Sequence, residues 1–251
     1  MGKNKRTVLL NGACGRMGQA IANVCRSSPD FEIRYALEHP QHSKIGTSLY
    51  SGKDKKKYSL KNISIEKSID KFKVDFVVDF STPNSALKIA HQAHDLKIPF
   101  VTGTTGFTST QLKKLQALSK KIPILQSYNM SVGVNIVLKI LKENISYFRT
   151  TNMEISETHH KGKIDSPSGT AKLIKSTILE AANRKFKINI DSKREGDVVG
   201  EHTLASYGNK ENIFITHEAL DREIFASGAL IMGRELLKKR KGFYSIFDLI
   251  Q

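Results

Sequence analysis

The fold of this chain is decided by residues 7–18, which read TVLLNGACGRMG. Four β-prone residues lead directly into a turn with glycines at positions 12, 15 and 18, and residues 19–26 then place apolar side chains at helical spacing. A strand, a glycine-rich turn and a helix in this order open a dinucleotide-binding βαβ unit, because the turn lets backbone N–H groups approach a pyrophosphate. The glycine spacing, G-x-x-G-x-x-G, is a variant of the usual G-x-G-x-x-G.

A carboxylate follows the second strand of this unit. The strand expected at 31–37 is followed by Glu38, twenty residues beyond Gly18. An acid in this position can accept hydrogen bonds from both ribose hydroxyls of an adenosine, and it repels a 2′-phosphate. The structural alternative is a tight turn with an exposed acid nearby. The order and spacing of turn and acid favour the dinucleotide interpretation.

The alternation of strands and helices continues to residue 125. Apolar runs predict strands at 74–80, 99–101 and 122–125, and helical spacing predicts helices at 84–96 and 109–120. This series predicts an α/β fold with a Rossmann-type, doubly wound parallel sheet. Ligands of such a sheet lie beyond the carboxyl ends of its strands.

The pattern changes from residue 131 onward and indicates a second, α+β domain. A last helix, from 221 to about 239, and the segment 243–250 are expected to return to the first domain. We therefore expect a dinucleotide-binding domain at 1–130 and 219–251, and a second domain at 131–218. We read residues 55–61 as a mobile loop. The second domain's expected helices are 132–148 and 171–182, and its expected strands are 153–157, 198–207 and 211–216.

The formal net charge of +16 raises nucleic-acid binding as an alternative. Thirty of the forty basic residues are lysine, however, whereas bidentate recognition of phosphates and bases favours arginine. The basic runs at 53–57 and 238–241 are better explained as solvated surface, so no nucleic-acid partner is predicted. A positive field still attracts an anionic substrate and cofactor.

The composition also limits the cellular locations in which we expect the protein. No apolar run approaches the roughly 20 residues of a membrane span, so no membrane association is predicted. The apolar run near the N-terminus is too short for a secretory signal. The two cysteines lie in the glycine turn and the following helix, which is typical of reduced thiols. We expect a cytoplasmic protein.

Residues 157–170, ETHHKGKIDSPSGT, have the composition of an active site. They connect an expected strand to an expected helix. Imidazoles exchange protons near neutral pH, and a lysine is a proton donor or a cationic partner for a carboxylate. The hydroxyls and free N–H groups at the helix entry suit an anion. An anionic ligand is therefore expected here.

The two adjacent histidines cannot share one task, because neighbouring residues of a strand point to opposite faces. One is expected to titrate while the other binds. Metal binding by His159, His160 and Asp165 is a further alternative, but their spacing matches no common zinc pattern. We predict no metal.

Four blocks make the chain resemble the 4-hydroxy-tetrahydrodipicolinate reductase (dihydrodipicolinate reductase) family. They are residues 12–18, 103–107, 129–135 and 157–170, and together they extend over nearly the whole chain. The resemblance implies a two-domain enzyme, usually a homotetramer, in the diaminopimelate route to lysine, with the domain at 131–218 serving substrate binding and oligomerisation. Such enzymes use a nicotinamide cofactor to reduce a small cyclic imine dicarboxylate to tetrahydrodipicolinate.

The resemblance also implies roles for residues of this chain. His159 and Lys163 are expected to be catalytic, the first as proton donor or acceptor and the second as proton donor. The substrate-binding residues are expected to be His160, Lys163, Ser168, Gly169 and Thr170. The cofactor contacts are expected to be Gly12, Ala13, Cys14, Gly15, Arg16, Met17, Glu38, Gly103, Thr104, Thr105, Ser127, Tyr128, Asn129 and Met130.

One departure from the family bears on the cofactor. Members that use NADPH well often have arginine directly after the strand-end acid, whereas this chain has His39 followed by Pro40. NADH is therefore the expected cofactor and NADPH the alternative, because a protonated His39 or Lys44 could replace the missing cation.

Two other functions remain open on the residues alone. The first is another two-domain NAD-dependent dehydrogenase acting on an amino acid or a semialdehyde. The second is a catalytically silent protein that binds NAD or a nucleic acid. The histidine and lysine of the 157–170 block favour the reductase over both.

Overall fold

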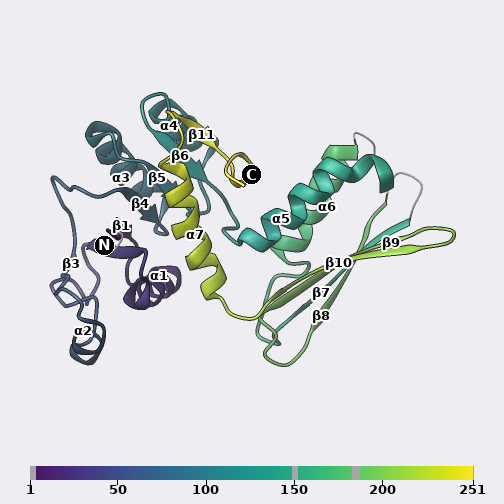
Figure 1. Ribbon diagram of the computed structural model, residues 1–251, viewed down its shortest axis with the longest axis horizontal. Helices are drawn as coiled ribbons and strands as arrows, with labels where there is room; N and C mark the ends of the chain where they lie inside the picture. The colour runs from purple at the N-terminus through teal and green to yellow at the C-terminus, as the bar shows by residue number, and fades with distance from the viewer. Residues whose placement is uncertain (1–3, 149–151, 183–186, 251) are drawn as a thin grey trace. The chain divides into compact units, whose positions relative to one another are not determined.

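The computed structural model describes residues 4–148, 152–182 and 187–250, and the chain forms two compact units (Figure 1). Unit 1 consists of residues 1–130 and 225–251, and unit 2 of residues 131–224. The second crossing between the units falls after Ile224, six residues later than the sequence suggested. The reason is that strand β10 (Asn212–Ala219) still pairs within unit 2, and the chain leaves that unit only as helix α7 (Glu223–Leu236) begins.

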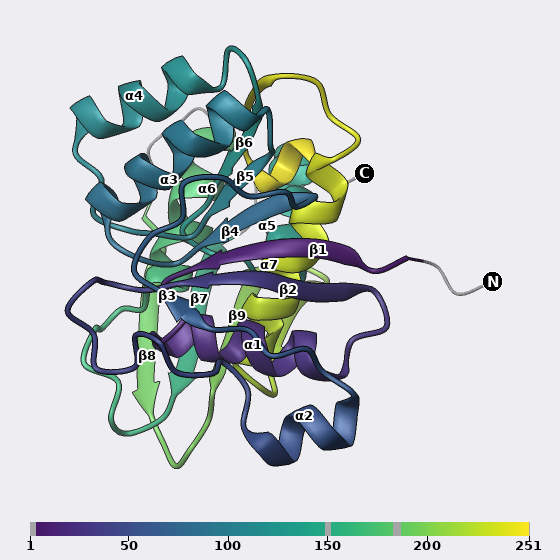
Figure 2. The same cartoon turned by 90° about the vertical axis from the view of Figure 1, so that its left-hand side faces the viewer.

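Unit 1 is an α/β structure around one parallel sheet. The sheet has seven strands in the order β11-β6-β5-β4-β1-β2-β3. Figure 2 shows β1 between β4 and β2. Strands β1 and β4 lie side by side at its centre, so the chain reverses its direction of winding there, and ligands bind at such a point in doubly wound sheets. The strands are β1 (Arg6–Asn11), β2 (Phe31–Leu37), β3 (Ile65–Glu66), β4 (Phe76–Asp79), β5 (Phe100–Thr102), β6 (Pro123–Gln126) and β11 (Gly242–Tyr244).

The helices of unit 1 begin at residues suited to that position. Helix α3 (Pro83–Leu96) has Thr82 as its N-cap and proline in its first turn, and α4 (Ser109–Leu118) begins with a capping box formed by Thr108 and Gln111. Helix α1 (Arg16–Ser27) differs, because its N-cap Gly15 offers no side chain to the first-turn N–H groups. Those donors remain available for a ligand.

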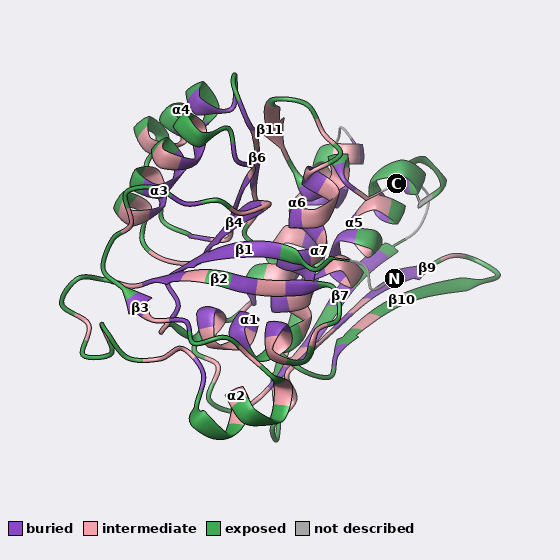
Figure 3. Ribbon diagram, turned by 60° about the vertical axis from the view of Figure 1, so that its left-hand side comes forward, coloured by how far each residue is buried: buried purple, intermediate pink, exposed green. Residues whose placement is uncertain are grey.

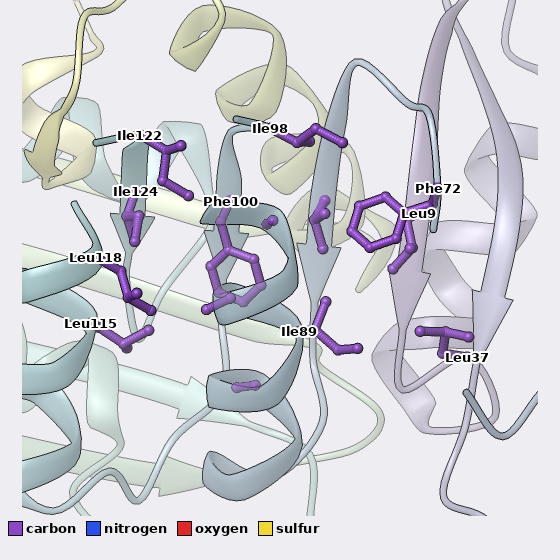
Figure 4. Packing of buried hydrophobic residues seen from close by; sticks show 14 residues of the cluster. Leu9, Leu37, Phe72, Ile89, Ile98, Phe100, Leu115, Leu118, Ile122 and Ile124 are labelled. Atoms are coloured by element: carbon purple, nitrogen blue, oxygen red, sulfur yellow. The ribbon is translucent and has the colours of Figure 1, made fainter. Parts of the chain in front are cut away.

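Helices cover both faces of the unit 1 sheet. On one face, Ile89 of α3 and Leu115 of α4 pack against Phe100 and other strand residues in one hydrophobic cluster (Figure 4). On the other face lies α7, where a Cβ atom at Gly233 would overlap with the ring of Phe76. Burial of these apolar faces holds the carboxyl ends of the strands in fixed positions.

One expectation for unit 1 was wrong. Residues 52–58 form the helix α2 (Gly52–Tyr58), whereas the sequence suggested a mobile loop at 55–61. The Ser51 hydroxyl accepts a hydrogen bond from the N–H of Asp54, and Ser59 ends the helix in a left-handed conformation. Lysine is a good helix former, so a capped lysine-rich segment folds even without a buried face.

Unit 2 is a mixed four-stranded sheet in the order β10-β9-β7-β8. Strands β7 (Asn152–His159) and β8 (Asn189–Arg194) are parallel, with helix α6 (Gly169–Ala182) between them in the chain. Strand β9 (Gly200–Tyr207) pairs antiparallel with both β7 and β10. Helix α5 (Val132–Asn144) continues as a short 3-10 helix (Ile145–Phe148), and a second such helix (Ile246–Asp248) follows β11 in unit 1.

Burial differs between the two sheets (Figure 3). Strands β1 and β4 are almost entirely buried, whereas β10 is exposed along most of its length. Among the residues that the structure describes, no helix combines the length and apolar character needed to cross a membrane.

Candidate active site

The glycine turn of unit 1 is held by close packing. Gly12 has a φ of 84°, and a Cβ atom there would overlap with the carbonyl oxygen of Phe80. A Cβ atom at Gly18 would overlap with the carbonyl oxygen of Gly12. At Gly15, in contrast, a Cβ atom would make only an ordinary contact, at 3.5 Å from the carbonyl oxygen of Gly12, and the residue is exposed at the start of α1. The turn is therefore tightly packed at Gly12 and Gly18, whereas the N-terminus of α1 is open. This arrangement suits a pyrophosphate.

Glu38 lies directly at this turn. Its Oε2 accepts a hydrogen bond from the backbone N–H of Cys14 at 2.7 Å, and its Oε1 accepts one from the N–H of His39 at 2.8 Å. Burial, helped by the nearby Glu38 carboxylate, raises the pKa of the Cys14 thiol, so this cysteine is not an activated nucleophile. The carboxylate and the turn together form one side of a binding site.

A cavity of about 560 Å³ opens beside Glu38. Its volume falls within the range of small-molecule sites. It contains two exposed lysines, Lys67 and Lys88, that the sequence analysis did not consider. Its walls come from the ends of β1, β2 and β4 and from α3, and they include Gly12, Gly15, Glu38, His39, Ser81 and Lys88.

A buried carboxylate connects the strand ends beneath this site. Asp79, at the end of β4, accepts hydrogen bonds from Asn11 of β1 at 2.7 Å and from Thr102 of β5 at 2.6 Å. It also accepts bonds from the hydroxyls of Ser81 and Thr104. Burial raises the pKa of Asp79, and these four hydrogen bonds oppose the increase. The network holds three neighbouring strand ends in register.

The other expected cofactor residues lie at the same edge of the sheet but outside this cavity. Gly103, Thr104 and Thr105 follow β5, and residues 127–130 follow β6. The side chain of Thr104 is buried and bonded to Asp79, whereas Tyr128 is exposed. The structure thus brings Gly12, Gly15 and Glu38 together in one cavity and places the remaining residues on adjacent loops.

The catalytic candidates lie in unit 2. His159 is the last residue of β7 and is buried, and its Nδ1 lies 2.7 Å from Oε2 of Glu157. The distance suits a hydrogen bond, although the angle is poor, so the contact is best described as electrostatic. The two residues share a face of the sheet because they are two positions apart on one strand.

Further charged and titratable groups surround this pair. The guanidinium of Arg194 lies 3.2 Å from Oε1 of Glu157, and the ring of His202 packs edge-on against His159 with centroids 4.9 Å apart. Burial opposes ionisation of Glu157, but the hydrogen-bonding groups of Ser192, Ser168 and Arg194 outweigh it and lower its pKa to about 2.

Burial favours the neutral form of an ionisable group, so it raises the pKa of a carboxyl group but lowers the pKa of a histidine. It lowers the pKa of His159 below the usual value, and Lys163 and Arg194 add to the effect, whereas Glu157 opposes it. Burial, together with the nearby His159, lowers the pKa of His202 to about 4. Both rings are therefore mainly neutral at neutral pH.

The loop between β7 and α6 carries the other candidates. Lys163 contacts the carboxylate of Asp165 at 2.5 Å, and this contact lowers the pKa of Asp165. Ser168 is buried, and its hydroxyl accepts a hydrogen bond from the N–H of Ala171. Gly169 and Thr170 begin α6, and the space at the Cβ position of Gly169 is open. The first turn of α6 can accept a carboxylate.

His160 faces different surroundings from its neighbour. Its Nε2 lies 3.0 Å from the Arg222 guanidinium, in a cavity of about 410 Å³ lined also by Asp197 and Asp221. Unit 2 thus brings His159, Ser168 and Glu157 into direct contact, and it places His160 beside Arg222.

One cluster has ligand atoms close enough for a metal ion. These atoms, from Glu157, His159 and His202, lie within 4.8 Å of one another. This set differs from the His159, His160 and Asp165 set that the sequence suggested. The Arg194 guanidinium already supplies a cation to Glu157, and the Ser168 hydroxyl lies 3.1 Å from Nε2 of His202. A second cation would have to displace these partners.

Several of these residues were missed by sequence reasoning. Glu157 belongs to the 157–170 block. It precedes His159 by two residues on an expected strand, which indicates that the two side chains lie on the same face. Arg194, His202 and Arg222 carry no local signal, because they reach the site through strand pairing and a long-range contact.

Comparison with known protein families gives one consistent result. Residues 6–130 match the family model described as dihydrodipicolinate reductase, N-terminus, and residues 133–250 match the model described as its C-terminus. The chain is 37% identical to a 4-hydroxy-tetrahydrodipicolinate reductase of Buchnera aphidicola subsp. Cinara cedri, over 99% of this chain and 98% of the relative. It is 35% identical to the enzyme of that name from Archaeoglobus fulgidus, over 97% and 99% of the two chains.

Solved structures agree on the fold. The dipicolinate-bound dihydrodipicolinate reductase from Paenisporosarcina sp. TG-14 superposes with a TM-score of 0.80 at 22% identity, covering 98% of this chain and 100% of that one. An amine dehydrogenase from Mycobacterium smegmatis gives 0.62 at 10% identity, covering 100% and 97%. Two family models match the two halves of the chain in order and relatives align along its whole length, so the chain belongs to the dihydrodipicolinate reductases, NAD(P)-dependent oxidoreductases of the diaminopimelate route to lysine.

Proposed function

We propose that His159 and Lys163 carry the proton transfer in the reaction of this family, the NAD(P)H-dependent reduction of 4-hydroxy-tetrahydrodipicolinate to tetrahydrodipicolinate. The observation that carries the proposal is the arrangement of one loop in unit 2. Between residues 157 and 170 it holds a buried imidazole in contact with a carboxylate, a partly exposed ammonium group and the start of helix α6, where the space at the Cβ position of Gly169 is open. Proton transfer and binding of a dianion need these groups together.

We assign the substrate carboxylates to Ser168, Gly169, Thr170, His160 and Lys163. Helix N-termini and cationic side chains stabilise carboxylates, and the space before Gly169 is open. Dipicolinate, which is bound in the Paenisporosarcina reductase structure, is a cyclic dicarboxylate like the substrate. We therefore expect it to bind here as an inhibitor.

The 4-hydroxyl group of the substrate leaves as water, which gives a ring with a carbon conjugated to the imine. Reduction of that ring then requires one hydride, which the nicotinamide cofactor would supply when bound, and one proton. The electron-rich enamine that results must be protonated, and Lys163 is the donor we assign because its ammonium group remains partly exposed. His159 accepts or returns a proton at the buried end of the site, while the nearby cations stabilise the dianionic ring.

We place the cofactor in unit 1, at the turn formed by Gly12, Ala13, Cys14, Gly15, Arg16 and Met17. The uncapped start of α1 supports the assignment, as does the Glu38 carboxylate beside the cavity. The loops 103–105 and 127–130 complete the proposed site. We propose NADH as the preferred cofactor because Glu38 disfavours a 2′-phosphate and no arginine follows it. NADPH is the alternative cofactor, because Lys67 and Lys88 line the same cavity and are cations suited to a 2′-phosphate.

We also propose that the protein is a homotetramer assembled through unit 2. Strand β10 is an edge strand of the sheet, and its Ile213 and Phe214 side chains are 43% and 59% exposed. Tyr207 of β9 packs edge-on against Phe214 and extends the apolar surface. An exposed apolar edge of this kind is a common interface between identical subunits. The cytoplasm remains the expected location.

The experiment that tests the function measures oxidation of NADH at 340 nm. The substrate is the freshly prepared condensation product of pyruvate and aspartate semialdehyde, and Lys163→Ala is the control variant. Rapid oxidation that the variant abolishes is expected. If folded protein that binds NADH shows no oxidation, an amino-acid or semialdehyde dehydrogenase becomes the better assignment.

A further inference from the structure

We propose that Glu157 is a positioning residue that holds His159 and the Ser168 loop in one arrangement for catalysis. The inference rests on the proposed role of His159 in proton transfer. Glu157 is not itself placed against the substrate, because its side chain lies within unit 2 and is only 1% exposed. Its influence on the reaction must pass through the groups that it contacts.

The two oxygens of the carboxylate serve two different elements. Oε2 lies 2.7 Å from Nδ1 of His159 on the same strand. Oε1 accepts a hydrogen bond from the backbone N–H of Ser168 at 3.0 Å and contacts Arg194 at 3.2 Å. Arg194 also donates to the carbonyl oxygen of Asp165 at 2.6 Å. One buried group therefore connects the catalytic imidazole directly with Ser168 and, through Arg194, with Asp165 of the substrate-binding loop.

The contact also determines which nitrogen of His159 reacts. The ionised carboxylate lies 2.7 Å from Nδ1 and favours the tautomer with the proton on Nδ1, because the positive end of an N–H bond then faces the anion. Nε2 is then the nitrogen that exchanges a proton with the substrate. Nε2 lies close to Gly200 of β9, where a Cβ atom would be only 2.9 Å away. Carboxylate–imidazole pairs fix orientation and tautomer in this way in other enzymes.

The charges around His159 make this carboxylate decisive. Burial, together with Lys163 on the loop and Arg194 on β8, disfavours a charged imidazole at His159. His202 on β9 packs edge-on against the same ring and is mainly neutral. Glu157 on β7 acts against burial and the two cations and favours the charged form. Without this anion, transient protonation of His159 during turnover becomes harder.

The test compares Glu157→Gln with the matched control Glu154→Gln, which removes an exposed carboxylate from the same strand. Glu157→Gln keeps the shape and removes the charge. Its kcat is expected to fall on the order of a hundredfold, which is within the contribution of a general acid or base. The acidic limb of its kcat profile is expected to move to lower pH, because loss of the anion lowers the pKa of His159. Glu154→Gln is expected to match the wild type.

A measurement without turnover separates this inference from the proposed reaction. Titration of the His159 ring followed by NMR is expected to show a lower pKa in Glu157→Gln than in the wild type. Dipicolinate binding is expected to weaken, while NADH binding in unit 1 stays unchanged. A loss of packing alone would leave the histidine titration where it was.

The outcomes decide the proposal in either direction. An unchanged kcat and an unchanged His159 titration in Glu157→Gln would overturn it, even if the wild type reduces the substrate. Should Glu157→Gln fail to fold, Glu157→Asp decides, because it keeps the charge on a shorter side chain. A lower kcat in Glu157→Asp, with the acidic limb of the kcat profile at the wild-type pH, supports the positioning role of Glu157. A wild-type kcat in Glu157→Asp refutes that role.

Discussion

Arg222 donates a hydrogen bond to Nε2 of His160 at 3.0 Å, although the two residues are 62 positions apart in the chain. A guanidinium has no acceptor, so Nε2 must be unprotonated and the proton of His160 lies on Nδ1. Nδ1–H is then the group that can reach a substrate carboxylate. The contact lies in a cavity of about 410 Å³.

Replacement of Arg222 by alanine tests this arrangement. The variant loses both the fixed tautomer and a cation beside the proposed carboxylate site. We expect KM for the cyclic substrate to rise about tenfold, with a smaller change in kcat, because the contact binds ground state and transition state alike. Steady-state kinetics and dipicolinate titration measure the effect. Arg34→Ala, which removes an exposed arginine of unit 1, serves as control. A normal KM for Arg222→Ala would exclude this contact from substrate binding.

Gly200 is predicted to be required for the position of His159. A Cβ atom there would lie 2.9 Å from Nε2 and 3.2 Å from Cδ2 of the imidazole. In Gly200→Ala we expect the ring to move and kcat to fall tenfold or more, since a misplacement of about 1 Å is costly in catalysis. Gly52→Ala is the control, because the space around Gly52 is open. Full activity of Gly200→Ala would show that the imidazole tolerates the shift.

Local patterns explain why much of unit 1 could be predicted. The segment from β1 to β2 combines continuous apolar runs with a glycine turn, and each feature depends on residues close in sequence. The predicted and observed strand 31–37 agree to the residue. Short-range signals of this kind survive folding because tertiary packing reinforces them.

Other elements carry no such signal. Strand β8 has the polar sequence NIDSKR and alternates only between exposed and half-buried residues, so it exists because β7 pairs with it. The role of Glu157 depends on groups from three elements that meet only in the folded unit. Residues of this kind need the structure, because their function lies in contacts distant in sequence.

The two lysines beside Glu38 yield a prediction about the cofactor. If they bind a 2′-phosphate, the double variant Lys67→Ala with Lys88→Ala will lower kcat/KM for NADPH about tenfold or more and leave that for NADH nearly unchanged. The double variant Lys113→Ala with Lys114→Ala, on the exposed side of α4, controls for net charge. In the wild type we expect the larger kcat/KM with NADH. Equal losses for both cofactors would place the lysines near a shared phosphate instead.

His202 is predicted to make the protein sensitive to acid. Its pKa is about 4 in the folded protein and near 6.5 when unfolded, so only the unfolded chain takes up a proton between these values. The fold therefore loses stability as the pH falls from about 6.5 to about 4, by on the order of 3 kcal/mol at most. Thermal denaturation across this range should show a declining Tm.

The variant His202→Gln removes this titration and keeps a polar group toward Ser168. Its Tm is expected to depend less on pH between 6.5 and 4 than that of the wild type. His91→Gln, at an exposed position of α3, is expected to behave like the wild type. An identical pH dependence in all three proteins would assign the acid sensitivity to other groups.

The exposed edge of unit 2 leads to a prediction about assembly. Phe214 is 59% exposed on the edge strand β10 and packs only edge-on against Tyr207, so it is available to a second subunit. A charge at this position must be desolvated in any interface, which opposes association. We therefore expect Phe214→Asp to form smaller species than the tetramer that we propose for the wild type, as measured by light scattering after size-exclusion chromatography. Tyr147→Asp, which alters an 83% exposed aromatic residue elsewhere in unit 2, is the matched control. A tetramer in both variants would move the interface away from β10, because a buried aspartate there could not be accommodated without loss of assembly.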